Sequence, residues 1–297
     1  MRSRMHRFVL SVSALWVASA ACSSPAKAVV DAGVEAAAYV PDYDAKGCQT
    51  PIGGEIPGAV CITSLKGKVV DENGKPIADL VTTACGDGCT FGKTDASGVA
   101  SMAVHRYMHK AAMMLHGRST YATYYAAITG EGDIDKGTLI LPRMPNEGVT
   151  IPEDGVATTL LSGDVKLTLP QGVKVAIDKM ELEEPSQQQY RALSVPLEKA
   201  PAFVDATSKI VALYALTPFA TTFDPGVGVS IPNRTNLAAG AAVEFFSHGT
   251  EADDKYGTFA SFTKVAEGHV SADGSVIQTD DGQRLSELSW LGVRLKP

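Results

Sequence analysis

Short apolar runs separated by turn-forming residues most limit what residues 48–145 can fold into. The runs cover residues 65–70, 77–84, 99–104, 121–128 and 138–141. Turn-forming stretches lie between them, at residues 71–76 with an Asn-Gly pair, at 86–88 and at 95–98. Runs of this length suit strands, and several strands about ten residues apart are typical of an all-β sandwich or barrel.

Residues 146–297 carry a second set of such runs. Residues 165–169 and 173–177 alternate apolar and polar side chains around Pro170-Gln171-Gly172, which predicts a hairpin with one buried face. Further strands are expected at residues 210–216, 227–231, 243–247, 276–279 and 285–290. We therefore predict an all-β protein with two antiparallel β-sandwich domains, at residues 48–145 and 146–297.

Two motifs in the first region belong together in a known family. The opening G-x-V-x-D-x-x-G-x-P-I is formed by Gly67, Val69, Asp71, Gly74, Pro76 and Ile77. A later turn, T-D-x-x-G, is formed by Thr94, Asp95 and Gly98. With both motifs the region resembles the carboxypeptidase regulatory-like domain, a transthyretin-like and immunoglobulin-like β-sandwich. Members of that family are accessory or adhesive modules, so the resemblance implies no active site here.

Parts of the second region are similar to another sandwich family. These parts are residues 216–225, 231–233, 272–276 and 288–292. They resemble the ZU5-type sandwich and its later part in secreted bacterial repeat proteins. The resemblance implies a second β-sandwich and names no ligand.

An export signal precedes both regions. Arg2, Arg4 and Arg7 come before an apolar stretch at residues 8–17, and small residues follow up to Cys22. This is the order of a signal peptide, and the apolar stretch is shorter than the roughly 20 residues that a membrane-spanning helix needs. Residues 1–21 are therefore assigned to a signal peptide.

Cys22 resembles the lipidated cysteine of bacterial lipoproteins, whose thiol receives lipid and becomes the new N-terminus. Small residues precede Cys22 as in that family, but Ser19 stands where the family usually has leucine. The alternative is ordinary signal cleavage after Ala20, because residues 18–20 fit an A-x-A site. We expect a lipidated Cys22 that begins a flexible tether at residues 22–47, which show no strand pattern.

The other four cysteines form an even set, as expected for disulfides in an oxidising compartment, and lipidation of Cys22 would leave no odd thiol. Cys85 and Cys89 flank a three-residue loop, so they face each other across a hairpin. Cys48 and Cys61 enclose a segment rich in proline and glycine. Of the three pairings that four cysteines allow, we predict Cys48–Cys61 and Cys85–Cys89.

The charge of the chain limits its partners. It has 26 Lys and Arg against 33 Asp and Glu, with a formal net charge of −7. The signal peptide contains basic but no acidic residues, so its removal makes the net charge of the mature chain more negative. This balance argues against nucleic acid or anionic lipid as a partner, because both attract clustered Lys and Arg.

Motifs for nucleotide or metal binding are incomplete in the first region. Residues 86–94 lack one glycine of a phosphate-binding loop, and a turn follows them where the helix should begin. His105 and His109 are four residues apart, with His116 beyond them, but Arg106 stands where zinc proteases have their catalytic glutamate. We expect the three histidines in an irregular segment at residues 102–118, where the chain departs from the carboxypeptidase regulatory-like pattern.

Motifs for catalysis are incomplete in the second region as well. His248 and Glu251 match the H-x-x-E of metallocarboxypeptidases, but that family places a third ligand far downstream on an α/β fold. No G-x-S-x-G nucleophile motif occurs in the sequence. We therefore predict no catalytic residue, no metal site and no cofactor.

Tyr121, Tyr124 and Tyr125 form an aromatic cluster in the sequence. In a strand, Tyr121 and Tyr125 share one face and Tyr124 takes the other. One interpretation is core packing with the hydroxyls at the rim. The other is a ligand-contact face on which a sugar or a protein partner packs.

Together these features predict a lipid-anchored, non-enzymatic protein of the bacterial cell envelope, on the periplasmic or surface face of the outer membrane. Its role would be adhesion, envelope structure or ligand binding by loops of a β-sandwich. The expected partners are the membrane, through the N-terminal lipid, and an envelope protein or glycan. The alternatives are a secreted hydrolase or metal-dependent enzyme without a recognisable motif, and a carbohydrate-binding accessory module.

Overall fold

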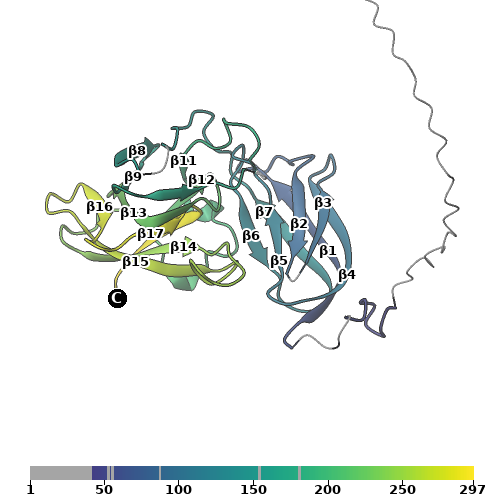
Figure 1. Ribbon diagram of the computed structural model, residues 1–297. Helices are drawn as coiled ribbons and strands as arrows, with labels where there is room; N and C mark the ends of the chain where they lie inside the picture. The colour runs from purple at the N-terminus through teal and green to yellow at the C-terminus, as the bar shows by residue number, and fades with distance from the viewer. Residues whose placement is uncertain (1–41, 52–53, 55–56, 87, 153–154, 180–181) are drawn as a thin grey trace, which may run out of the picture. The chain divides into compact units, whose positions relative to one another are not determined.

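The computed structural model describes residues 42–51, 54, 57–86, 88–152, 155–179 and 182–297 (Figure 1). These residues form strands joined by turns, with two short 3-10 turns at Leu197–Lys199 and Ala206–Ser208. The prediction of an all-β protein is therefore confirmed. No helix in the described part of the chain is long and apolar enough to cross a membrane. The predicted signal peptide and Cys22 lie outside the described residues.

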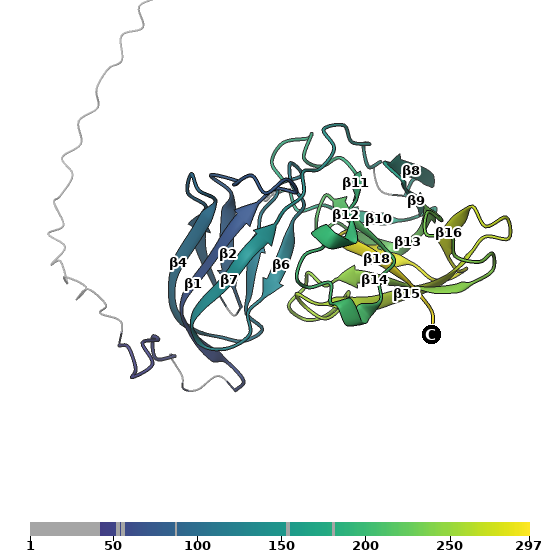
Figure 2. The same ribbon diagram turned by 180° about the vertical axis from the view of Figure 1, so that it is seen from behind.

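The first sandwich consists of two facing sheets (Figure 1, Figure 2). One sheet has the order β4-β1-β7, formed by Val99–Met108, Val60–Val70 and Gly132–Ile140. The other has the order β3-β2-β5-β6, formed by Cys89–Lys93, Val81–Cys85, Ala112–Leu115 and Tyr124–Ala127. Leu65 and Val69 of β1 share a buried cluster with Met113 and Leu115 of β5, which holds the two sheets together.

One strand pair of this sandwich is parallel, which differs from the predicted antiparallel arrangement. β1 pairs with β4 in antiparallel fashion, with Leu65 opposite Met102, and with β7 in parallel fashion, with Leu65 opposite Ile134. An alternating pattern identifies a strand and its buried face, but it is the same whichever way a neighbouring strand runs.

The two turns of the quoted motifs form as expected. Asp95 accepts hydrogen bonds at Oδ1 from the backbone N–H groups of Ser97 and Val99. Gly98 has a φ of 79°, and a Cβ at this position would lie 2.5 Å from the carbonyl oxygen of Val69. The turn therefore requires glycine for both its conformation and its close contact with β1.

Most of residues 102–118 lies in two strands rather than in the irregular segment expected. β4 continues through Met108 in one sheet, and β5 lies in the other. A register shift between Ile62 and Ser64 of β1 faces a bulge in β4, where His105 has a φ of 51°. A bulge interrupts the two-residue alternation, which explains why the sequence pattern weakens here.

The second sandwich is built around one long, curled sheet of order β11-β12-β18-β14-β15-β16-β13-β9-β8, with β10 and β17 also paired to β13. Its strands are Thr158–Ser162 (β8), Val165–Leu169 (β9), Lys174–Ala176 (β10), Arg191–Ser194 (β11), Ala212–Thr217 (β12), Thr222–Pro232 (β13), Ala242–His248 (β14), Phe262–Val270 (β15), Val276–Thr279 (β16), Leu285–Glu287 (β17) and Trp290–Leu295 (β18). Val229 of β13 and Val243 of β14 share one core although two strands separate them in the sheet, so the sheet folds over on itself. Its end strands meet where the N–H of Ala192 donates to Oγ of Ser162 at 3.1 Å.

The predicted hairpin at residues 165–177 is wrong. β9 and β10 do not pair with each other; both pair with β13, with Leu167 opposite Val229 and Val175 opposite Phe223. Pro170-Gln171-Gly172 therefore interrupts one continuous run along β13 and does not reverse the chain. Prolines and glycines indicate that strand pairing breaks off. The same residues occur where the chain reverses in a hairpin and where a strand is merely interrupted, so the sequence does not distinguish the two.

The two disulfides join the predicted pairs. Cys48 and Cys61 have Cα atoms 5.8 Å apart, and those of Cys85 and Cys89 are 4.2 Å apart. Residues 42–47, which the sequence assigns to the flexible tether, are folded onto β4: the carbonyl oxygen of Gly47 lies 2.8 Å from Nδ1 of His105. The tether prediction is therefore wrong for these residues, because contacts with β4 order them and their own composition does not reveal it.

The predicted domain boundary at 145/146 falls between the two sheet systems, since β7 ends at Ile140 and β8 begins at Thr158. The core does not stop there. Val195, Phe219 and Trp290, from the second region, belong to the same buried cluster as the core of the first sandwich.

Candidate functional site

The tyrosine cluster lies where the two sandwiches meet, and Tyr124 is buried there. Its ring packs edge-on against Phe203, with centroids 5.3 Å apart, and against Trp290 at 6.0 Å. Burial raises the pKa of the Tyr124 phenol, and its hydroxyl has no hydrogen-bond partner among the described residues. Tyr124 therefore packs in the core as one interpretation expects, but its hydroxyl is not at the rim.

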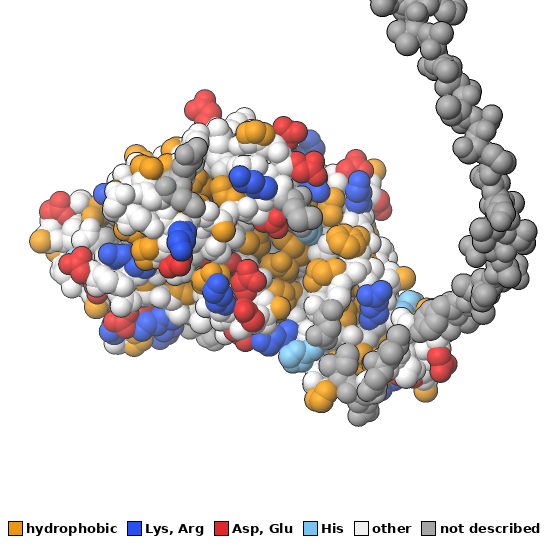
Figure 3. Space-filling view, viewed as in Figure 1, with side chains coloured by type: hydrophobic (Ala, Val, Ile, Leu, Met, Phe, Trp, Pro, Cys, Tyr) orange, Lys and Arg blue, Asp and Glu red, His pale blue; other side chains and the backbone are white. Residues whose placement is uncertain are grey.

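Tyr125 also contributes to this junction. Its ring lies 4.9 Å from that of Phe259, and its backbone N–H donates to Nε2 of His248 at 3.1 Å. Beside it, Nε1 of Trp290 donates to the carbonyl oxygen of Thr123 at 2.9 Å. Hydrophobic side chains come to the surface between β6 and β14 (Figure 3).

Tyr121 is not part of β6, so it does not share a strand face with Tyr125. The guanidinium carbon of Arg143 lies 4.7 Å from the Tyr121 ring centroid, and Nη2 of Arg143 donates to the Tyr121 hydroxyl at 2.6 Å. The three tyrosines therefore form no common ligand face.

His248 packs among aromatic rings at the junction of the two sandwiches. It is fully buried and stacks on Phe203 with ring centroids 4.1 Å apart. Burial lowers the pKa of His248 to about 3, because a charged imidazolium is poorly solvated there. The neutral ring accepts the hydrogen bond from Tyr125.

Two of the three histidines of the first region, His105 and His116, contact different partners. Nε2 of His116 lies 3.1 Å from Oγ1 of Thr83, whereas His105 contacts the carbonyl oxygen of Gly47. Across the described residues, no group of three or more His, Cys, Asp or Glu side chains is arranged to hold a metal ion.

A polar cavity of about 280 Å³ lies in the second sandwich, between the end of β14, the following loop, the start of β15 and β17. It is lined by Ser247, Lys255, Tyr256, Gly257, Lys264, Val265, Arg284, Leu285, Ser286 and Glu287. We call it the Glu287 cavity. No sequence motif marks this cavity, and Glu287 falls within the predicted strand at residues 285–290.

Glu287 is the most unusual group in this cavity. Its side chain belongs to a residue only 2% exposed, and the hydroxyl of Thr250 donates to its Oε1. Its Oε2 has no hydrogen-bond partner among the described residues. Burial raises the pKa of Glu287 to about 7, and the hydrogen bond from Thr250 opposes only part of that rise. Near neutral pH the carboxyl is therefore often protonated and able to donate a hydrogen bond.

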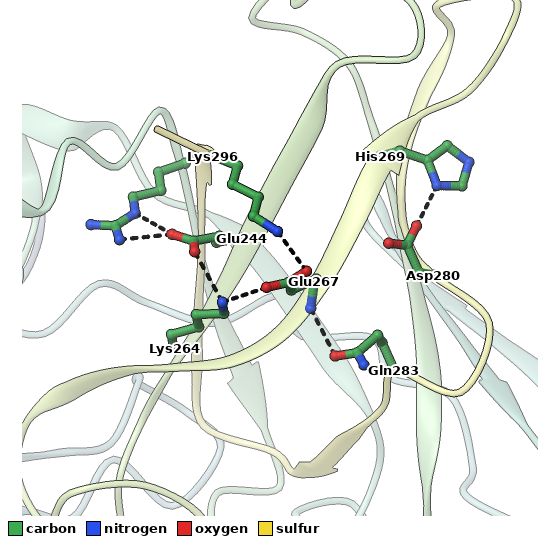
Figure 4. Close-up of polar contacts among 8 residues, drawn as sticks. Glu244, Lys264, Glu267, His269, Asp280, Gln283 and Lys296 are labelled. Carbon is green, nitrogen blue, oxygen red and sulfur yellow. Dashed lines mark hydrogen bonds and ion pairs between the residues drawn. The ribbon is translucent and has the colours of Figure 1, made fainter.

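Lys264 lines the same cavity, but two carboxylates neutralise its charge (Figure 4). Its Nζ lies 3.0 Å from Oε1 of Glu244 and 2.6 Å from Oε1 of Glu267. Glu244 also binds Arg294 at 2.7 Å, and Glu267 also binds Lys296 at 2.8 Å. This network crosses β14, β15 and β18, so Lys264 is fixed in the wall and is not a mobile cation.

Lys255 and Arg284 are the other cations of the cavity. Nζ of Lys255 lies 4.7 Å from the ring centroid of Tyr256. Nη1 of Arg284 donates to the carbonyl oxygen of Gln283 at 2.8 Å. In the part of the chain that the structure describes, neither forms an ion pair with a carboxylate.

Arg284 also borders a second hollow, of about 270 Å³. That hollow lies over β9, β13 and β16 and is lined by Lys166, Thr168, Pro170, Gly228, Val229, Ser230, Gln278, Thr279, Asp281 and Arg284. The two hollows share only Arg284 among these residues. The side chain therefore stands between two polar depressions of the second sandwich.

Comparisons with known proteins add little. No family model matches the chain, and no curated protein matches it. Among solved structures, it is similar to a DUF3823 family protein from Parabacteroides merdae, with 8% identity over 76% of this chain and 98% of the other, at a TM-score of 0.21. At this level of similarity nothing about function passes from that protein to this chain.

Proposed function

We propose that this chain is a non-enzymatic, ligand-binding protein of the bacterial cell envelope, exported by its N-terminal signal and anchored through lipid on Cys22. Four of its five cysteines form two disulfides, which leaves Cys22 as the odd thiol. Disulfides persist in oxidising compartments, so the pairing supports export.

The observation that carries the ligand-binding part is the buried carboxyl of the Glu287 cavity. A buried polar atom without a partner destabilises a protein by about 1–3 kcal/mol. Such atoms are rare in folded proteins, and groups with strongly shifted pKa values cluster at functional sites. Glu287 sits in a cavity formed by strand ends and loops, which is where β-sandwiches commonly bind ligands.

The composition of the cavity favours binding over hydrolysis. A raised pKa would suit Glu287 as a general acid, but glycoside hydrolases commonly use a pair of carboxyl groups. Glu287 is the single carboxyl side chain among the described residues that line the cavity. We therefore place hydrolysis second to binding.

The two resemblances complete this proposal. The first sandwich would be a carboxypeptidase regulatory-like module, which presents the second, ZU5-like sandwich away from the membrane. Its turn at residues 94–98 has the geometry that the quoted motif requires. Ligand binding is assigned to the second sandwich, because the Glu287 cavity lies there.

Anchoring is tested by detergent phase partitioning of the protein expressed in a Gram-negative host. Cys22→Ser should move it from the detergent phase to the aqueous phase, since no other lipid attachment site is proposed. The matched variant Ser19→Leu restores the residue usual in lipoproteins and should leave it in the detergent phase. A Cys22→Ser protein that still partitions into detergent would contradict the anchor.

Ligand binding is tested with a cavity-filling variant, Ser286→Trp. An indole at this lining position should block every ligand of the cavity, whatever its charge. A library of sugars and organic acids is screened by thermal shift against both proteins. Stabilisation of the wild type that is absent from the variant supports the proposal, and equal responses of both proteins count against it.

A further inference from the structure

Basic side chains outnumber acidic ones in the lining of the Glu287 cavity, where Glu287 is the one carboxyl group among the described residues. Lys264 is paired with Glu244 and Glu267, whereas Lys255 and Arg284 form no ion pair among the described residues. The contact with Tyr256 and the nearby charges of Asp253 and Glu251 raise the pKa of Lys255, so it stays protonated. The chain as a whole is acidic, with 33 Asp and Glu against 26 Lys and Arg. A local excess of cations on such a chain favours an anionic ligand, because opposite charge lowers the free energy of binding.

The two cations suit an oxyanion. Arg284 has a planar guanidinium whose N–H groups match the spacing of carboxylate or phosphate oxygens. One of these groups is engaged by the Gln283 carbonyl, which fixes the orientation of the side chain without reducing its charge. Lys255 adds a compact charge held over the Tyr256 ring.

Glu287 adds a requirement of its own. A protonated carboxyl that already accepts a hydrogen bond at Oε1 can donate from its second oxygen, which is buried and has no partner among the described residues. The ligand must therefore present an acceptor oxygen in addition to its anionic group. The cavity, at about 280 Å³, is at the lower end of the 300–1,000 Å³ typical of small-molecule sites, so the ligand is small.

We infer that the Glu287 cavity binds a small ligand bearing a carboxylate or phosphate, with the oxyanion on Lys255 and Arg284 and a further oxygen accepting a hydrogen bond from Glu287. This inference rests on the proposed ligand-binding function and specifies the class of ligand. A sugar acid has both features in one molecule, since its hydroxyls and ring oxygen accept hydrogen bonds while its carboxylate carries the charge.

The test is isothermal titration calorimetry on the full-length protein in detergent, at about pH 6, where Glu287 holds its proton. The probes are D-glucuronate, D-glucose as its neutral counterpart, and inorganic phosphate. Glucuronate or phosphate should bind and glucose should not. Binding of glucuronate alone assigns a carboxylate, and binding of phosphate alone assigns a phosphate group.

Three substitutions locate the binding. Arg284→Gln and Lys255→Gln each remove one charge from the cavity and should weaken binding about tenfold or more. Lys75→Gln removes an exposed charge from a turn of the first sandwich and should leave binding unchanged. Lys255 is an exposed residue, so its variant keeps the test valid even where Arg284→Gln unfolds the protein.

The failure of this inference differs from the failure of the proposed function. If glucose binds as tightly as glucuronate and Ser286→Trp abolishes both, the anionic ligand class is wrong and the ligand-binding function stands. If the anionic probes bind equally well to Arg284→Gln, Lys255→Gln and the wild type, the inference is overturned. If none of the three probes binds the wild type, it is overturned as well.

Discussion

Burial shifts the pKa values of two residues, His248 and Glu287, in opposite directions. It disfavours the charged form of each, so it lowers the pKa of the histidine to about 3 and raises that of the glutamate to about 7. The neutral histidine can therefore accept the N–H of Tyr125, and the neutral glutamate can donate to a ligand. Sequence spacing suggests neither role, because the burial comes from residues far away in the chain.

The Glu287 carboxyl should make stability depend on pH. Its pKa is about 7 in the folded protein and about 4.5 in the unfolded chain, so its contribution is fully present below pH 4.5 and is lost as the pH rises through 7. The difference corresponds to about 3 kcal/mol. Glu287→Gln keeps a neutral side chain that can still accept from Thr250. We expect the variant to match the wild type at low pH and to be more stable at high pH.

Urea denaturation of both proteins at several pH values measures this difference directly. Asp135→Asn serves as the control, since it neutralises a carboxyl group on β7 outside the cavity. A stability difference between Glu287→Gln and the wild type that does not change with pH would show that the carboxyl is not buried as described.

Strand prediction succeeded where the alternation is regular and failed where pairing departs from it. β9 and β16 have the predicted bounds, and in β9 the apolar residues alternate without interruption. The bulge at His105 weakens the pattern of β4. β15 was missed since charged Lys264 and Glu267 interrupt its apolar run, and their ion pairs depend on partners in other strands. Register, strand direction and hairpin pairing are non-local, so they do not show in a local pattern.

The two disulfides should differ in their effect on stability. Cys48 and Cys61 are buried and enclose a separation of 13 residues, whereas Cys85 and Cys89 are 4 residues apart in a tight hairpin. The chain-entropy model assigns about 3 kcal/mol to the larger loop and less to the smaller one. We expect the double variant Cys48→Ser/Cys61→Ser to lose more stability than Cys85→Ser/Cys89→Ser.

Thermal unfolding of the two double variants and the wild type measures which variant loses more stability. The second variant is the matched control for the first, because each replaces two half-cystines by serines. An equal or larger loss in Cys85→Ser/Cys89→Ser would mean that the hairpin, and not the entry to β1, depends more on its bridge.

Across the whole molecule, the two sandwiches share one buried core, to which both contribute aromatic side chains. The rings of Phe203 and Trp290 pack on Tyr124. Nε1 of Trp290 also donates a hydrogen bond to the carbonyl oxygen of Thr123, the residue next to Tyr124. The sequence predicts two regions of strands with a boundary near residue 145. It does not predict that their cores join, because the joining residues lie more than 70 positions apart. The same applies to the Glu287 cavity, whose walls come from separate strands and loops.

The central claim is that Glu287 is a buried, protonated carboxyl that meets a ligand. The most direct measurement is a pH titration of its side-chain carboxyl carbon by 13C NMR, assigned through the loss of that resonance in Glu287→Gln. We predict a midpoint near pH 7. The midpoint should rise when D-glucuronate is added, because the ligand accepts a hydrogen bond from the protonated carboxyl and so stabilises the protonated form. A midpoint near 4.5 that the ligand does not move would contradict the account.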